Sequence, residues 1–71
     1  MKYYVIEIQT NADGTSGNLV FPYAERADAE EKFHQVAAVA AKSAVMVHTV
    51  VMMTREGAFV KSESYTHPVE E

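Results

Sequence analysis

The sequence contains no cysteine, and this absence removes two ways of stabilising a small domain. Without cysteine the chain can form neither a disulfide nor a thiolate metal site. Its 71 residues allow one domain, and a domain of this size buries only about 60% of the surface of its unfolded chain. Such a core is marginally stable. Because disulfides and thiolate metal sites are excluded, we expect association with another copy to supply the additional stability.

Basic side chains are also few: six lysines and arginines stand against ten aspartates and glutamates, and the formal net charge is -4. This balance argues against nucleic acid as a partner, because such binding rests on neutralising phosphates. No membrane span is expected, since the apolar-rich runs at residues 36–41 and 44–53 fall short of the roughly 20 residues required. The first residues lack the apolar stretch of a signal peptide, and we expect a cytoplasmic protein.

One helix is predicted over residues 26–42, where alanine and glutamate are frequent. Its apolar residues recur at the spacing that lines one helical face. They are Ala29, Phe33, Val36, Ala37 and Ala40. We expect this face to pack on a sheet.

Three strands are predicted, over residues 2–10, 45–54 and 58–66. The first alternates between Tyr4, Ile6 and Ile8 on one face and Tyr3, Val5, Glu7 and Gln9 on the other. The second is a charge-free, β-branched run, and the turn at Gly57 joins it to the third as a hairpin. The acidic tail, residues 67–71, is expected to be frayed.

These elements predict an α+β domain in one βαββ unit, with a three-stranded, mostly antiparallel sheet and one helix on one face. Two strand orders are open. Strand 45–54 could lie parallel beside strand 2–10, or strand 58–66 could lie between them in an all-antiparallel sheet. We favour the second order.

Residues 11–24 are predicted to form a loop, within which residues 19–21 could be a short extended piece. Its oxygen-bearing side chains make it a candidate ligand-binding loop, with Asn11, Asp13, Thr15 and Asn18 as the binding residues. A calcium loop would need a glycine at Ser16 and a glutamate at Pro22, so no metal is expected. The alternative is a plain solvent-exposed connection, although its length favours a function.

One helix covers only one face of a sheet, yet both faces of strand 45–54 are apolar. We therefore predict a homo-oligomer, most simply a twofold dimer in which the helix-free faces stack. The expected interface residues are Tyr3, Val5, His48, Val50, Met52, Phe59 and Tyr65. In the alternative, a monomer, the loop 11–24 folds over the second face.

Residues that carry catalysis or bind cofactors are scarce. His34, His48 and His67 match no ligand spacing, and no serine has a histidine at a diagnostic spacing. Glu7 and Glu63 could form an acid/base couple on neighbouring strands. We predict neither a catalytic residue nor a cofactor.

Nearly the whole chain resembles a group of short bacterial proteins, typical of gut Firmicutes, for which no function is known. The resemblance rests on "KYYVIEIQTNADGTSGN", "AEEKFHQV" and "VHTVVMMTREG". Our leading hypothesis is a non-enzymatic, homodimeric accessory protein that binds another macromolecule, which could be another protein. The alternative is a small-molecule-binding protein or minor enzyme with a pocket at the dimer interface near residues 11–18, where Asp13, Glu7 and Glu63 supply the polar groups.

Overall fold

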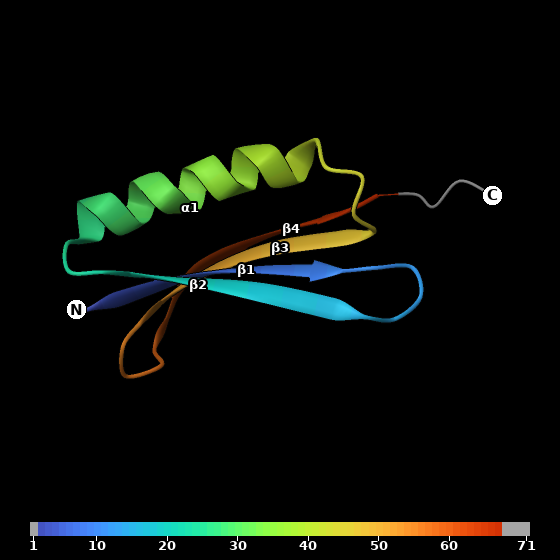
Figure 1. The fold of residues 1–71 in the computed structure, drawn as a ribbon. Coiled ribbons are helices and arrows are strands. Elements are labelled where there is room, and N and C mark those ends of the chain that lie inside the picture. Colours follow the sequence, from blue (N-terminus) through green and yellow to red (C-terminus); the bar gives the residue numbers. More distant parts are fainter. Residues whose placement is uncertain (1, 68–71) are drawn as a thin grey trace.

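One helix lies across an antiparallel sheet in the computed structural model, which describes residues 2–67 (Figure 1). The elements in chain order are β1 (Tyr3–Thr10), β2 (Ser16–Tyr23), α1 (Arg26–Ala41), β3 (Val47–Thr54) and β4 (Phe59–Thr66). Residues 68–71 of the predicted acidic tail lie outside the described residues. The fold is α+β with a single helix in the described part of the chain, as predicted.

The prediction of a three-stranded sheet is wrong, because residues 16–23 form a fourth strand. This strand, β2, pairs antiparallel with β1, for example Val20 with Ile6. It contains Gly17 and Pro22, residue types that are depleted in strands. Most of its side chains are exposed, and its sequence shows no alternation of apolar and polar residues. Such a composition is tolerated here because β2 is an edge strand.

The sheet order is β2-β1-β3-β4, and all neighbouring strands are antiparallel. Both predicted orders are therefore wrong, since β3 lies directly beside β1 and runs opposite to it. The physical reason is β2, which adds one reversal of the chain between β1 and α1. Without that reversal the crossover would have placed β3 parallel to β1.

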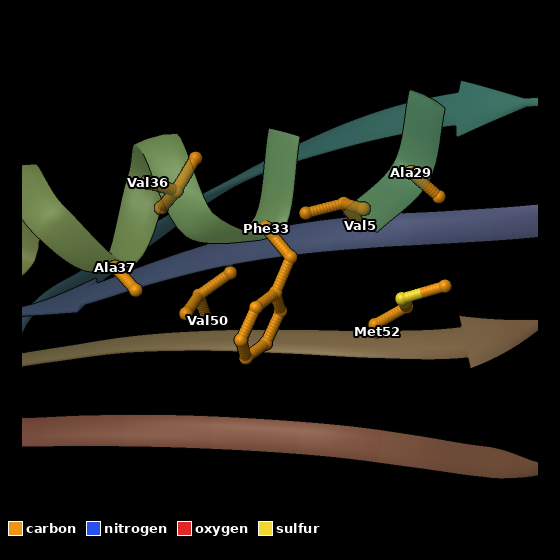
Figure 2. Close-up of a cluster of buried hydrophobic side chains, with 7 residues drawn as sticks. All are labelled: Val5, Ala29, Phe33, Val36, Ala37, Val50 and Met52. Carbon is orange, nitrogen blue, oxygen red and sulfur yellow. The ribbon is translucent and has the colours of Figure 1, made fainter. Parts of the chain in front are cut away.

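Helix α1 covers one face of the sheet and packs mainly on β1 and β3 (Figures 1 and 2). Its buried residues are those predicted from the spacing: Ala29, Phe33, Val36, Ala37 and Ala40. From the sheet, Val5, Val50 and Met52 complete the core, and each is fully buried (Figure 2). A buried aliphatic or aromatic side chain of this size contributes about 1.5–3 kcal/mol, so these contacts hold the two layers together.

The other face of the sheet meets no element of residues 2–67 (Figure 1). In the alternative prediction the loop 11–24 folds over that face, and this arrangement is wrong, because residues 16–23 lie in the plane of the sheet as β2. Side chains alternate between the two faces along each strand. Val5 therefore points to the helix, whereas Tyr4 and Ile6 point away from it.

Candidate functional site

The candidate ligand-binding loop is the tight turn that joins β1 to β2. The backbone N–H of Asn11 donates to the carbonyl of Thr15 at 2.8 Å, and the N–H of Gly14 donates to the carbonyl of Asn11 at 3.0 Å. Gly14 has a φ of 89°, in the left-handed region that glycine adopts without strain. The stretch is therefore the connection of a β-hairpin.

Three of the predicted ligand residues bind one another in this turn. The hydroxyl of Thr15 donates to Asp13 Oδ1 at 2.6 Å, its backbone N–H donates to the same oxygen at 2.9 Å, and Asn11 Nδ2 donates to Thr15 Oγ1 at 3.1 Å. The hydroxyl and then the amide of Thr15 hold the pKa of the Asp13 carboxyl below its ordinary value of 3.8. These groups hold the turn together, and the fourth predicted residue, Asn18, lies apart from them on β2.

The residues predicted for a dimer interface lie mostly beneath the helix. Val5, His48, Val50 and Met52 are buried in the layer between α1 and the sheet. Tyr3 and Tyr65 are partly buried and pack against the same core. Only Phe59, with 68% of its surface exposed, is freely accessible. The physical reason is that the predicted set of alternating side chains points to the helix, so the side chains between them in the sequence point to the helix-free face.

We call this second set the open face. The strand registers and the alternation of side chains assign it four residues from each strand. They are Ser16, Asn18, Val20 and Pro22 of β2; Tyr4, Ile6, Ile8 and Thr10 of β1; Val47, Thr49, Val51 and Met53 of β3; and Phe59, Ser62, Ser64 and Thr66 of β4. None of these residues carries a charge. The apolar residues of this face cluster toward one end, where Ile6 is the cross-strand neighbour of Val20 and Val51, and Tyr4 that of Pro22 and Met53. The rows at the other end are mostly polar, since Ile8 pairs with Asn18 and Thr49.

On the helix side of the sheet, a glutamate and a histidine form a buried pair. Glu7 Oε2 of β1 lies 2.6 Å from His48 Nε2 of β3, with exposed side-chain fractions of 13% and 2%. Gln9 Nε2 also donates to Glu7 Oε2, at 3.4 Å. The other nitrogen of His48, Nδ1, is buried and has no hydrogen-bond partner within residues 2–67.

Two adjoining hollows share the Glu7 side chain, and together we call them the Glu7 groove. The first, of about 310 Å³, is lined by Glu7, Gln9, Asn11, Gly17, Asn18 and Leu19. The second, also of about 310 Å³, is lined by Glu7, Lys32, Gln35, Val36 and Val39. The groove thus runs between α1 and the β1–β2 hairpin, on the side of the sheet opposite to the open face. It combines a carboxylate and amides with apolar walls, as small-molecule sites do.

The predicted couple of Glu7 and Glu63 does not form. Both residues are paired with Val50 in the sheet register, so β3 separates them. The strand alternation predicted Glu7 on one face with Val5, but the Glu7–His48 pair was not predicted. The missing signal was the register of β1 against β3, which joins residues 41 positions apart.

The other two histidines have separate surroundings. His34 is an exposed helix residue, whose Nε2 lies 3.6 Å from Glu30 Oε2, and His67 Nε2 lies 2.9 Å from the carbonyl oxygen of Ala40. Within residues 2–67 no three histidine, aspartate or glutamate side chains gather as a metal site would need. The structure therefore does not bring the three histidines together.

Helix α1, the single helix of residues 2–67, is not both long and apolar enough to cross a membrane. No protein-family model, curated protein or solved structure matches the chain. The resemblance to short bacterial proteins stays a prediction, and the open face and the Glu7 groove are the two surfaces from which we infer a function.

Proposed function

We propose that this chain is a non-enzymatic interaction protein that works as a twofold homodimer, in which the open faces of two copies stack. The observation that carries this proposal is the uncharged face on the helix-free side of the sheet, with its apolar cluster around Ile6, Val20 and Val51. Along a strand of an antiparallel sheet, the side chains on the face that stays in water are normally polar. A face of this kind is instead typical of a surface that is covered by another molecule.

The size of the open face supports a second copy as the molecule that covers it. Four strands of eight residues make a face about 26 Å long and about 19 Å wide, since strands rise about 3.3 Å per residue and lie about 4.8 Å apart. The flat projection is about 500 Å², and the relief of the side chains increases the accessible area. This approaches the roughly 800 Å² that each partner buries in a stable interface.

The distribution of charge also supports self-association. In a twofold dimer the same surface comes from both copies, so a charge near the twofold axis meets its own like charge. The open face carries none, whereas the helix-facing side and α1 carry charged residues such as Glu7, Lys61 and Glu30. The central residues Ile6 and Val51, which are cross-strand neighbours, would meet their own copies near the twofold axis.

The test is the molar mass in solution by sedimentation equilibrium over a series of protein concentrations. We expect twice the chain mass, and the chain mass alone for Val51→Glu, because that variant brings two carboxylates into an apolar contact. Val39→Glu is the matched control, since Val39 is 64% exposed on the helix, and it should keep the dimer. A monomeric wild-type protein, or a Val51→Glu protein that stays dimeric, would contradict the proposal.

A further inference from the structure

The Glu7 carboxylate is held in place and still has unused capacity to accept hydrogen bonds. Both hydrogen bonds to it, from His48 and from Gln9, reach the same oxygen, Oε2. An ionised carboxylate offers about four lone-pair sites. No lysine or arginine of residues 2–67 lies within 4.0 Å of it, and its ion-pair partner there is His48. A partly buried carboxylate with this environment is complementary to a further cationic donor.

The walls of the first hollow of the groove indicate what kind of cation fits. Gln9 and Asn11 carry amide oxygens that accept hydrogen bonds, and Leu19, 55% exposed, supplies an apolar surface. A metal ion such as calcium would need six to eight oxygen ligands, and one carboxylate with amides does not supply the charge for such a site. An ammonium group has three donors and suits a single carboxylate with neighbouring amide oxygens.

Lysine 32 does not occupy this hollow. Lys32 lines the second hollow, and its ammonium lies 4.1 Å from the centre of the Phe21 ring. That distance is within the range of a cation–π contact. The positive charge of Lys32 is therefore directed at an aromatic ring, and no lysine or arginine of the described chain forms an ion pair with Glu7.

We infer that the Glu7 groove is a binding site for a small organic cation, a primary ammonium group on a short aliphatic body. The ammonium donates to Glu7 and to the amide oxygens beside it, and the aliphatic body packs against Leu19. His48 acts as a positioning residue, because the hydrogen bond of its Nε2 fixes the orientation of the Glu7 carboxylate. The site lies on the face opposite to the proposed dimer contact, so it does not depend on dimerisation.

The test is a titration of ¹⁵N-labelled protein with n-butylammonium chloride, followed by amide chemical shifts at constant ionic strength. A ligand of this size is expected to bind with a Kd of about 1–10 mM. We expect saturable shifts at Glu7, Gln9, Gly17 and Leu19, and none of them with sodium chloride alone. The result is independent of the sedimentation experiment, so each proposal can fail without the other.

Three variants make the result specific. Glu7→Gln keeps the shape of the side chain and should weaken binding about tenfold or more, since it removes a charge-assisted hydrogen bond. Glu63→Gln is the matched control, because Glu63 lies in the same row of the sheet but outside the groove, and it should bind as the wild type does.

The third variant, Gly17→Leu, fills the groove without touching the Glu7–His48 pair. A Cβ at Gly17 would meet no atom within 4 Å, and the backbone there is not in the left-handed region. We therefore expect a folded protein in which binding is lost, even if Glu7→Gln should fail to fold. The inference is overturned by an absence of saturable shifts, by equal binding to Glu7→Gln, or by shifts spread over the acidic surface of α1.

Discussion

Glu7 and His48 lie on neighbouring strands beneath the helix, with Glu7 Oε2 and His48 Nε2 2.6 Å apart. An ionised carboxylate only accepts hydrogen bonds, so Nε2 carries the hydrogen of this contact. His48 Nδ1 has no partner within residues 2–67. The pair therefore allows two polar residues to occupy positions next to the core.

The free-energy costs of replacing Glu7 and His48 should not be additive. We expect His48→Leu to lower the free energy of unfolding by about 1–3 kcal/mol, because Glu7 loses its buried donor. The double variant Glu7→Leu/His48→Leu should be destabilised by less than the sum of the two single variants, since neither polar group is left behind. Urea unfolding of all four proteins measures this difference. Strict additivity would show that the contact contributes nothing.

The pair of Glu30 and Lys61 should make stability depend on pH. The Lys61 ammonium donates to the Glu30 carboxylate across the gap between α1 and β4, and this bond, with smaller effects of Arg26 and His34, lowers the pKa of Glu30 from 4.5. A lowered pKa stabilises the fold at pH values above the ordinary value. That contribution is lost as the pH falls from 4.5 through the lowered pKa.

The measurement compares the free energy of unfolding of the wild type and Glu30→Gln between neutral pH and pH 3. The difference between the two proteins should shrink as the pH falls below 4.5. Glu31→Gln is the control, since Glu31 is an exposed neighbour on the same helix. A difference that stays constant over this range would exclude Glu30 as a source of acid sensitivity.

Two glycines of the β-hairpins should respond in opposite ways to alanine. Gly57 has a φ of 94° in the turn between β3 and β4, as predicted from the sequence. Gly57→Ala should destabilise the protein by about 1–2 kcal/mol, because a Cβ is strained in the left-handed region. Gly17 lies in a strand with open space around it, and Gly17→Ala should leave stability unchanged or raise it. Thermal unfolding of the two variants separates these outcomes.

The elements that sequence analysis predicted correctly are those that local patterns determine. Helix α1 was predicted because Ala29, Phe33 and Val36 follow the helical period, and the same residues are buried. The hairpin of β3 and β4 was predicted because Gly57 meets the requirement of a tight turn. In both cases the signal lies within about 20 neighbouring residues.

What sequence analysis missed depends on contacts between distant segments. Strand β2 carries Gly17, Asn18 and Pro22, and its pairing with β1 rather than its own composition makes it a strand. The choice of which face meets the helix follows from packing, so Val50 and Met52 were assigned to an interface although they form the core. The Glu7 groove needs the β1–β2 pairing as well, and no single segment contains its signal.

Two of the three phenylalanines, Phe33 and Phe59, provide the clearest test of the layer arrangement. Phe33 is 2% exposed in the core, and Phe59 is 68% exposed on the open face. Phe33→Ala should lower the free energy of unfolding by about 3–5 kcal/mol, a large part of the roughly 4–10 kcal/mol expected for a chain of this length. We expect this loss at every protein concentration, since Phe33 packs within one copy.

Phe59→Ala should behave differently, because its contacts in the proposed dimer come from the second copy. At concentrations where the protein is monomeric, we expect a change within about 0.5 kcal/mol, as for other exposed residues. Where the dimer is populated, the wild type gains stability by mass action and Phe59→Ala should gain less. Urea unfolding over a concentration series measures both effects. A Phe59→Ala cost that is the same at all concentrations would mean that Phe59 acts within its own chain, and the open face would then lose one of its proposed contacts.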